Sequence, residues 1–486
     1  MLRTGRQFLD TLGDGRVVYI GSERVQDVRR HPAFVGAADT LAASYDFKAA
    51  AANRATLTYR EQDRDCSAYF LRARSREDLR QRSDANKALA DLHFGFMGRG
   101  LDHVTSFVTG LAMEPEVLDR GTLKFGANIV KYYEYLRDHD LFASYAVHPA
   151  AQAKNKEAFG DLRGCQAVLR VTHEDDAGIV LNGMKMLATG GVFADQVWIG
   201  NLTPLAPDQG AQAITCAVPT NAPGLELWAR RPTALHATSF DDPLAMRFDE
   251  SDCMVIFKDV RVPWERVFVH NDAELSRQIY LDTPAHSYGN HQSNVRFLAK
   301  LQFILGVTNK VCLSAGVRQI PAVAQTLGRL AAMEAALDAM IKGQIYEYEQ
   351  RVRGGVSFNY RYVAAALNWC QESYPLIVNT LQELSGGSIF QMPADASVAT
   401  DPATRDIFLD YWRGNDETAV EKMKLYRIAW DVYGSGFGGR CTQYENFYAG
   451  PSFIVRGHSF RIARWDQFNA LVEGFMRSIP DPRPEP

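Results

Sequence analysis

The chain has 486 residues, and its 53 lysines and arginines nearly balance its 57 aspartates and glutamates. The formal net charge of −4 excludes the strong positive field that attracts nucleic acid or an anionic membrane surface. No apolar run approaches the roughly 20 residues that span a bilayer, and residues 1–16 lack the apolar stretch of a signal peptide, so we expect a cytoplasmic protein without membrane contact. The seven scattered cysteines predict free thiols and no metal centre built on a short cysteine motif.

Residues 1–145 are predicted to form an N-terminal helical domain. From Leu79 onwards apolar residues recur at helical intervals. Ser75 stands three residues before Asp78, which is the spacing of a helix N-cap and its reciprocal partner. A second helical pattern covers residues 125–145.

A glycine-rich stretch, FGFMGRG, leads into an apolar, helix-like run at residues 94–108. Arg99 and His103 stand four residues apart at this junction, and on a helix that spacing puts two side chains on one face. The chemical interpretation is a pair that acts on one small molecule in an apolar pocket. The structural alternative is a surface arginine next to a histidine at the edge of the core.

Residues 146–275 change to short β-rich runs separated by Gly, Pro and Asp clusters, which predicts a central antiparallel barrel or sandwich. The segment GMKMLATGG at 183–191 ends one run with a hydroxyl at Thr189 and two glycines that permit close backbone approach. Tyr145 and His148 stand at the junction of the first two domains, where cofactor sites often lie. The alternative for each is an ordinary loop or turn residue.

Residues 276–486 return to long helical patterns and are predicted to form a C-terminal helical bundle. His286 and His291 stand just before its first long helix, and either is suited to proton transfer because histidine titrates near neutral pH. The hexapeptide GSGFGG at 434–439 matches the glycine pattern of dinucleotide-binding loops. A helix is expected before it where a Rossmann fingerprint needs a strand, so we do not expect a dinucleotide site there.

Seven segments, taken in chain order, resemble one known family. They are HPAF at 31–34, MGRGLDHV at 97–104, YYEYLRDHDL at 132–141, GMKMLATGG at 183–191, FDESD at 248–252, VPWERVF at 262–268 and YENFYAGP at 444–451. The family is that of the 4-hydroxyphenylacetate 3-hydroxylases, the oxygenase components of two-component flavin monooxygenases, and the resemblance covers residues 5 to 475. It implies an α+β, acyl-CoA dehydrogenase-like fold with an N-terminal helical domain, a central antiparallel β domain and a C-terminal four-helix bundle.

The resemblance also implies an activity. Family members take reduced FAD (FADH2) from a separate NAD(P)H-dependent flavin reductase and react it with molecular oxygen. The resulting hydroperoxyflavin hydroxylates a phenol next to its hydroxyl, and the enzymes are typically homotetramers. We therefore expect a FADH2-dependent aromatic monooxygenase that acts on a small phenolic substrate, either free or tethered to a carrier protein.

Site residues follow from the resemblance position by position. Arg99 corresponds to the family arginine that lies on substrate and flavin, and His103 to its hydrogen-bonding partner four residues on. Tyr145 corresponds to a substrate-binding histidine, so the Tyr and His of 4-hydroxyphenylacetate hydroxylases are exchanged here. His291 best matches a histidine that some branches use as a base toward the phenol. Flavin contacts are expected from Arg99, Tyr145, Ala146, Val147, His148, Pro149, Gln152, Thr189, Gln443, Tyr444 and Asn446.

Two alternatives stay open at this point. One is oxidation of a non-phenolic ring such as an indole or pyrrole, and the other is an oxygen-independent flavoprotein lyase or dehydrogenase on the same fold. A related branch contains 4-hydroxybutyryl-CoA dehydratase, which holds an iron–sulfur cluster through cysteines on the arginine helix. Residues 93–113 contain no cysteine, and Ala299 precedes Lys300, which argues against a cluster.

Overall fold

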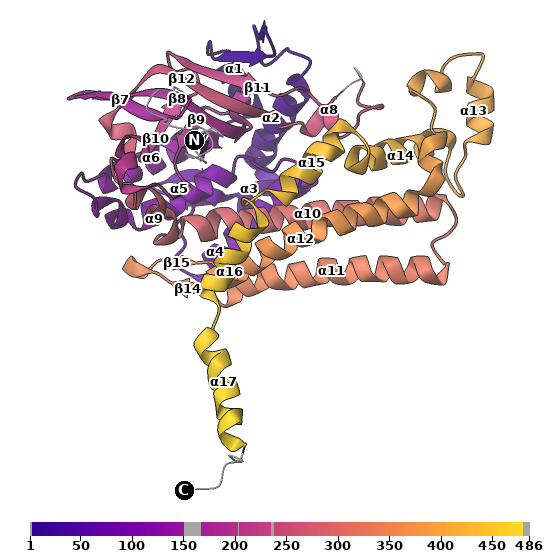
Figure 1. The fold of residues 1–486 in the computed structure, drawn as a ribbon. Coiled ribbons are helices and arrows are strands. Elements are labelled where there is room, and N and C mark those ends of the chain that lie inside the picture. The colour runs from indigo at the N-terminus through magenta and orange to yellow at the C-terminus, as the bar shows by residue number, and fades with distance from the viewer. Residues whose placement is uncertain (1, 150–166, 203, 235–237, 480–486) are drawn as a thin grey trace.

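A computed structural model describes residues 2–149, 167–202, 204–234 and 238–479, in which two larger sheets lie among the helices (Figure 1). The helices of the N-terminal part are α1 (Gly5–Thr11), α2 (Val35–Ala49), α3 (Arg54–Leu57), α4 (Arg76–Leu92), α5 (His103–Met113) and α6 (Gly126–His139). Within these described ranges no helix combines the length and the apolar character that crossing a bilayer requires.

Helix α4 begins where its sequence predicts. The Ser75 hydroxyl accepts a hydrogen bond from the Asp78 backbone N–H at 3.1 Å, and the Asp78 carboxylate accepts one from the Ser75 backbone N–H at 3.1 Å. This reciprocal capping box satisfies two backbone donors that a helix otherwise leaves unpaired. The apolar face that contains Leu79 and Leu89 is buried.

The central part contains two sheets. The larger has the strand order β2 (Glu23–Arg24), β1 (Val17–Ile20), β11 (Leu225–Ala229), β12 (Asp252–Pro263), β8 (Gly178–Thr189) and β6 (His148–Pro149), with β7 (Arg170–Asp175) paired to β8. The smaller has the order β13 (Val267–His270), β10 (Ile214–Pro219), β9 (Gln196–Ile199) and β5 (Ala143–Ala146). Most neighbouring strands are antiparallel, as predicted, but β1 pairs with β11 and β5 pairs with β9 in parallel.

The first 145 residues are less purely helical than their sequence pattern indicates. Strands β1 and β2 join the larger sheet, and β3 (Thr58–Glu61) and β4 (Arg64–Ser67) form a separate hairpin. Each of these strands has at most four residues, which is too short for a two-residue alternation to be distinguished from a loop. The pairing of β1 with β11 also joins segments about 200 residues apart in sequence, which no local pattern reports.

The C-terminal part is helical. Its elements are α9 (Leu275–Leu281), α10 (Ala285–Ser314), α11 (Pro321–Tyr346), α12 (Tyr360–Ser385), α13 (Arg405–Tyr411), α14 (Ala419–Tyr433), α15 (Gly436–Asn446), α16 (Ser452–Ile462) and α17 (Trp465–Ser478), with a short hairpin of β14 (Glu349–Gln350) and β15 (Val356–Ser357). The short helix α8 (Ala245–Phe248) belongs to the central part, between β11 and β12. Helices α10, α11 and α12 run side by side (Figure 1). His286 and His291 lie inside α10 and not before it, so that part of the prediction is wrong.

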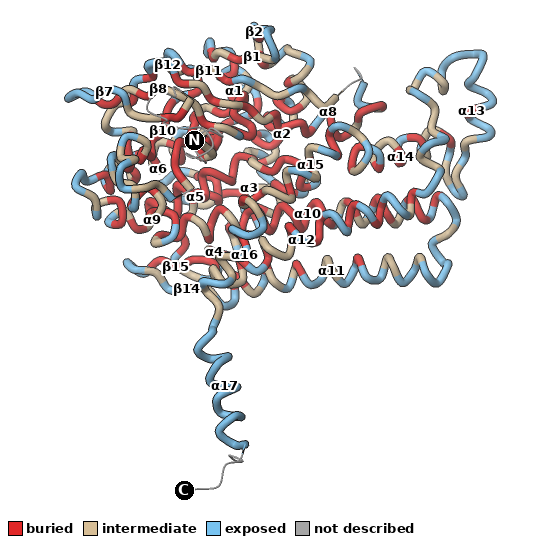
Figure 2. The backbone as a smooth tube through the Cα atoms, viewed as in Figure 1, coloured by how far each residue is buried: buried red, intermediate tan, exposed pale blue. Residues whose placement is uncertain are grey.

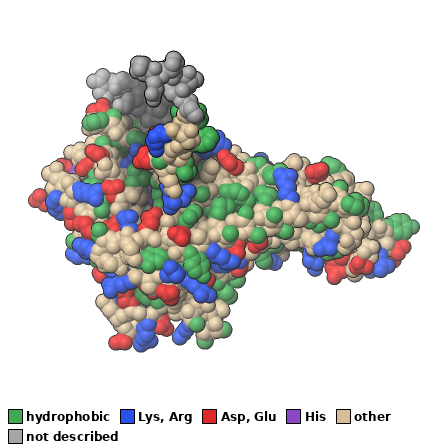
Figure 3. Space-filling view, turned by 90° about the horizontal axis from the view of Figure 1, so that it is seen from below, with side chains coloured by type: hydrophobic (Ala, Val, Ile, Leu, Met, Phe, Trp, Pro, Cys, Tyr) green, Lys and Arg blue, Asp and Glu red, His purple; other side chains and the backbone are tan. Residues whose placement is uncertain are grey.

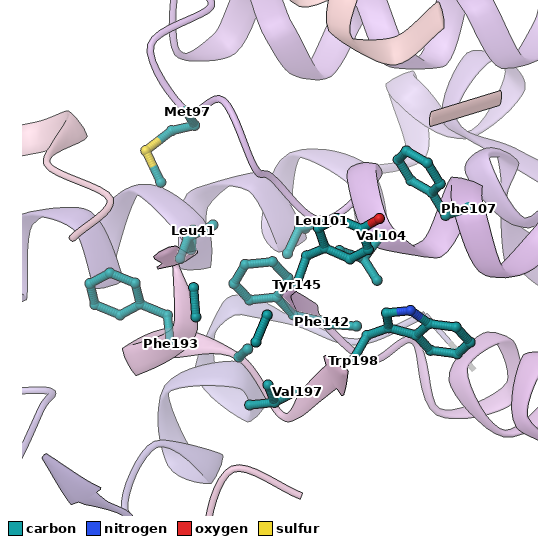
Figure 4. Packing of buried hydrophobic residues seen from close by; sticks show 14 of the residues in the cluster. Leu41, Met97, Leu101, Val104, Phe107, Phe142, Tyr145, Phe193, Val197 and Trp198 are labelled. Carbon is teal, nitrogen blue, oxygen red and sulfur yellow. The ribbon is translucent and has the colours of Figure 1, made fainter. Parts of the chain in front are cut away.

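One hydrophobic cluster extends through all three parts and forms the main core. Figure 4 shows part of it, in which Leu101, Val104 and Phe107 from α5 and the turn before it surround Tyr145 from β5. Buried residues concentrate where the sheets meet α5 and α10, whereas α17 is exposed along its length (Figure 2). The face in Figure 3 mixes acidic and basic side chains without a large region of one sign, in keeping with the small net charge.

A buried ion pair fixes the end of α6 against α2. The Lys48 ammonium lies 2.7 Å from the Asp140 carboxylate and donates to the Tyr69 hydroxyl at 2.8 Å. Ser67 and Tyr69 also donate to this carboxylate, at 2.7 Å and 3.0 Å. Burial lowers the pKa of Lys48, but the neighbouring Asp140 opposes that shift, so the two charges support each other. Removal of one partner leaves the other charge buried without compensation.

We expect Lys48→Met to lower the free energy of unfolding by about 3 kcal/mol or more, because Asp140 then stays buried without its cation. Chemical denaturation at neutral pH measures this loss. The double variant Lys48→Met/Asp140→Leu removes both charges and should be less destabilised than the single variant. If the double variant lost as much free energy of unfolding as two large single losses added together, the ion-pair explanation would be wrong.

Candidate functional site

Arg99 lies in the turn between α4 and α5, and two segments distant in the sequence hold it. Its backbone N–H donates to the Glu250 carboxylate at 2.7 Å. Its guanidinium donates to the Tyr448 carbonyl at 2.9 Å and lies over the Tyr448 ring, 4.2 Å from the centroid. Arg99 is therefore a held cation at an internal junction and not a free surface arginine.

His103 is the first residue of α5 and has no exposed surface. Arg99 precedes the helix, so the prediction that the two share one helix face is wrong, but the turn still brings their side chains into contact. The guanidinium Nη1–H donates to His103 Nε2. Burial lowers the pKa of His103 well below its ordinary value, and the nearby Arg99 lowers it further. His103 is therefore a neutral imidazole at physiological pH.

The Tyr145 side chain also lies next to His103, but it comes from the sheet. It lies on β5, and its ring stacks on Phe107 with centroids 5.6 Å apart and meets the His103 ring at 6.5 Å. Burial raises its pKa well above the ordinary value, so it stays a phenol. Its Oη is buried, and the neighbouring Tyr280 hydroxyl raises this pKa further. The structure thus brings together Arg99, His103 and Tyr145, which we call the central cluster.

The strand residues expected at the flavin continue directly from Tyr145. Ala146 and Val147 are buried, and His148 and Pro149 form β6 beside β8. The His148 ring packs on Phe447 with centroids 5.7 Å apart, so the end of α15 lies across from this strand. Gln152, which was expected to contact the flavin as well, lies outside the described residues.

Thr189, which was also expected to contact the flavin, is the last residue of β8. Its hydroxyl donates to the Asp252 carboxylate at 2.7 Å, and Asp252 accepts from the Arg440 guanidinium at 2.8 Å. Gly190 follows with φ of 70°, a left-handed conformation that favours glycine. The predicted strand-to-turn transition is confirmed, and it is tied to α15 through Arg440.

Helix α15 carries three residues that were expected to contact the flavin, and they lie in different surroundings. Tyr444 lies against the Arg99 turn, since a Cβ added at Gly98 would come 2.2 Å from its Oη. That Oη is buried and unpartnered among the described residues. Gln443 is exposed, and the Asn446 carbonyl accepts from the Gln371 amide at 2.6 Å. Of these three residues, Tyr444 is the one that contacts the turn that carries Arg99.

A buried triad on α10 and α15 was not identified from the sequence. The Glu445 carboxylate accepts from the Arg296 Nη2 at 2.8 Å and from the Lys300 ammonium at 2.6 Å. All three side chains are buried. The available signal was the pair of basic residues in the apolar run RFLAKLQF, because a charge in a buried helix requires a partner. The triad fixes the segment that carries Tyr444 and Tyr448.

The two histidines of α10 differ in surroundings. His291 stacks on Phe358 with centroids 3.6 Å apart, and its Nδ1 pairs with the Gln344 side chain at 2.6 Å. The structure does not bring it to the central cluster. His286 instead packs at 5.9 Å from the Phe107 ring and lines a cavity of about 330 Å³. Phe107 contacts both His286 and Tyr145, and Tyr280 lines the same cavity.

We expect Glu445→Gln to lower the free energy of unfolding at neutral pH by about 3 kcal/mol, because it leaves two buried cations without their anion. Burial opposes ionisation, but Arg296 and Lys300 hold the pKa of Glu445 at about 2 in the folded protein. This is below the unfolded value of about 4.3. The stabilisation is therefore complete above the unfolded value and is lost as the pH falls through about 2.

Urea unfolding of both proteins should show a stability difference that shrinks as the pH falls from about 5 to about 2. Glu372→Gln is the matched control, because Glu372 forms an exposed pair with Arg456. Its effect should stay below about 1 kcal/mol. A difference for Glu445→Gln that is constant with pH would contradict the ion-pair explanation.

Comparisons with known proteins identify the family. Family models described as 4-hydroxyphenylacetate 3-hydroxylase N terminal and C terminal match residues 4–269 and 276–477. The 4-hydroxyphenylacetate 3-monooxygenase oxygenase component of Thermus thermophilus is 29% identical and covers 98% of each chain. The 4-nitrophenol 2-monooxygenase oxygenase component of a Rhodococcus species is 29% identical, over 93% of this chain and 87% of the relative.

The fold is shared as well. The crystal structure of a 4-hydroxyphenylacetate 3-monooxygenase oxygenase component, complexed with FAD and 4-hydroxyphenylacetate, has a TM-score of 0.92 to this chain. The two are 29% identical and the match covers 98% of each. This confirms the expected acyl-CoA dehydrogenase-like fold. The chain belongs to the 4-hydroxyphenylacetate 3-hydroxylase family.

Proposed function

We propose that this chain is the oxygenase component of a two-component monooxygenase that uses reduced FAD and molecular oxygen to hydroxylate a phenol next to its hydroxyl. The observation that carries the proposal is the central cluster. It combines a fixed cation, a neutral imidazole and a buried phenolic hydroxyl in an apolar enclosure. The family membership and the solved relative with FAD and a phenol support the same assignment.

The residues present fit a flavin beside this cluster. Tyr444 Oη is a buried polar atom without a hydrogen-bond partner among the described residues, and such an atom calls for a ligand or water. We assign Arg99, Tyr145, Ala146, Val147, His148, Pro149, Gln152, Thr189, Gln443, Tyr444 and Asn446 to flavin contact. When bound, reduced FAD supplies the electrons that activate oxygen.

The central cluster recognises the phenol oxygen. Arg99 is a permanent donor and stabilises negative charge that develops on this oxygen as the ring is attacked. His103 accepts from Arg99 through Nε2 and so holds this donor in place, and the Tyr145 hydroxyl is a second polar group beside them. A non-phenolic ring offers no hydroxyl to these groups, which is why we favour a phenol. Phe107 and its apolar neighbours exclude water from the reacting atoms.

The exchange of His103 and Tyr145 leaves the two hydrogen-bonding groups in place but changes the order in which they face the substrate. We propose a small phenol, free or carrier-tethered, that differs from 4-hydroxyphenylacetate beyond its hydroxyl. The resemblance gives His291 a role toward the phenol. We propose that His286 takes this role instead, because His286 lies next to Phe107 and lines the cavity. Burial lowers the pKa of His286 to about 3, so it is a neutral imidazole at neutral pH.

We propose a separate NAD(P)H-dependent flavin reductase as partner, and a cytoplasmic location. The GSGFGG segment supports this, because helix α14 precedes it and α15 begins at Gly436, so no strand–turn–helix unit is present there. A dinucleotide loop needs that unit. The six described cysteines are unpaired, as expected in a reducing compartment.

The test supplies reduced FAD from an unrelated flavin reductase and follows oxygen use, hydrogen peroxide and product mass with a panel of phenols. The wild-type protein should hydroxylate at least one phenol, and NADH alone should not reduce FAD in its presence. Arg99→Ala should lower product formation by about two orders of magnitude or more and raise peroxide release. The reason is that the phenol loses its cation while oxygen still reacts.

Arg80→Ala is the matched control for this test, because Arg80 is 76% exposed on α4. It should hydroxylate and couple like the wild type. Unchanged coupling in Arg99→Ala, with the fold intact by circular dichroism, would remove Arg99 from the site. Direct reduction of tightly bound FAD by NADH would refute the two-component assignment.

We propose that the chain assembles into a homotetramer through α17. This helix projects from the body (Figure 2) and carries an exposed apolar stripe at helical spacing, Phe468, Leu471, Val472, Phe475 and Ile479. Leu471 is 71% exposed and Phe475 is 70% exposed. Such a stripe on a helix that buries none of its residues is typical of an interface. A second copy of the chain is the proposed partner.

We expect the double variant Leu471→Asp/Phe475→Asp to sediment as a smaller species than the wild-type tetramer in analytical ultracentrifugation, because two charges interrupt the stripe. Glu473→Gln changes the opposite face of α17 and should leave the tetramer intact. A wild-type monomer, or a double variant that remains tetrameric, would contradict this interface.

A further inference from the structure

Three buried polar side chains, Asn86, Asp102 and Gln292, form a hydrogen-bonded chain that ends at His103. None of them has a role in the phenol recognition proposed above. His103 Nδ1 is 3.1 Å from Gln292 Oε1. Gln292 Nε2 donates to Asp102 Oδ1 at 3.0 Å, and Asn86 Nδ2 donates to Asp102 Oδ2 at 2.7 Å. The four side chains are at most 3% exposed and come from α4, the Arg99 turn, α5 and α10.

The carboxylate decides the orientation of the amide. An ionised Asp102 can only accept hydrogen bonds, so the Gln292 group that faces it must be the amide nitrogen. Burial raises the pKa of Asp102 only to about 6, so it is ionised at neutral pH. The Gln292 carbonyl oxygen then faces His103. Because this oxygen can only accept, His103 must carry its proton on Nδ1.

The opposite side of the ring leads to the same result. The Arg99 guanidinium can only donate, and it faces His103 Nε2. A proton on Nε2 would place two N–H groups head to head in a buried space. Both neighbours therefore select the neutral tautomer with a proton on Nδ1 and a lone pair on Nε2.

We propose that Gln292, oriented by Asp102, is a positioning residue that keeps His103 in the Nδ1–H tautomer so that Nε2 accepts from Arg99 and holds the guanidinium in place. The role of that guanidinium toward a phenol rests on the proposed function, whereas the tautomer itself does not. With this arrangement Arg99 commits one N–H to His103 and keeps further N–H donors for the phenol oxygen.

The tautomer can be measured without substrate. Two protein samples are prepared with histidine labelled with ¹⁵N at Nδ1 alone or at Nε2 alone, and the His103 signal is the one missing from a His103→Asn sample. In solid-state NMR at neutral pH, His103 Nδ1 should resonate as a protonated nitrogen and Nε2 as a bare one. The reverse pattern, or two protonated nitrogens, overturns the proposal.

Activity then tests the consequence, with the best phenol from the panel. Gln292→Met removes both hydrogen bonds and should lower kcat/KM by about tenfold, the effect of one lost buried hydrogen bond. Gln292→Glu should recover most of that loss, since a protonated glutamate that shares its proton with Asp102 reproduces the amide pattern. Its His103 signals should match the wild type.

Gln344→Met is the matched control, because Gln344 forms the same kind of buried pair with His291 on the far side of α10. It should lower the melting temperature like Gln292→Met but leave kcat/KM and the His103 signals unchanged. Equal loss of kcat/KM in both methionine variants would make Gln292 a merely structural residue and overturn the proposal. If the wild type turned over no phenol, the proposed function would fail while the NMR result still judged the tautomer.

Discussion

The position of the Arg99 charge is the constraint on which the rest of the site depends. A guanidinium inside an apolar enclosure is stable only if each face and each donor finds a partner. Here the Tyr448 ring and carbonyl and the His103 nitrogen meet the side chain, and the Glu250 carboxylate holds the backbone of the same residue. These partners come from α5, the turn before β12 and the segment after α15. The cation therefore requires the N-terminal helices, the sheet and the C-terminal helices to meet at one point.

Helix α10 holds these parts of the chain together. Along one helix it presents Gln292 to His103, and Arg296 and Lys300 to Glu445 of α15. The first contact orients the imidazole, and the other two hold the segment with Tyr444 and Tyr448 against the Arg99 turn. A helix with so many buried polar groups tolerates little change, because each group loses its partner if the helix shifts. The rigidity of the central cluster follows from α10 more than from its own members.

Much of this could be predicted from the sequence, because local patterns report local structure. The capping box of Ser75, the strand-to-turn transition at Thr189 and the three-part order of helices, strands and helices all depend on residues close in the chain. Arg99, His103 and Tyr145 could be named through the family resemblance. Glu445 and Gln292 could not, because their roles depend on partners 145 residues or more away, and a lone Glu or Gln in a helix has no distinctive pattern. The helical spacing of Arg99 and His103 was misread for a related reason, since a glycine-rich turn can bring two side chains together without a helix.

The exchange of His103 and Tyr145 explains why the site needs the buried pair of Gln292 and Asp102 next to His103. A tyrosine hydroxyl rotates to suit its partner, so a tyrosine at position 103 would need no group to set the direction of its proton. A neutral imidazole has two nitrogens of opposite character, and it accepts from a given donor only when its proton is held on the other nitrogen. Gln292 and Asp102 commit Nδ1 as the protonated nitrogen, which leaves Nε2 to accept from the Arg99 guanidinium. The exchanged order is therefore compatible with phenol recognition because the chain also supplies the buried pair that a histidine at this position requires.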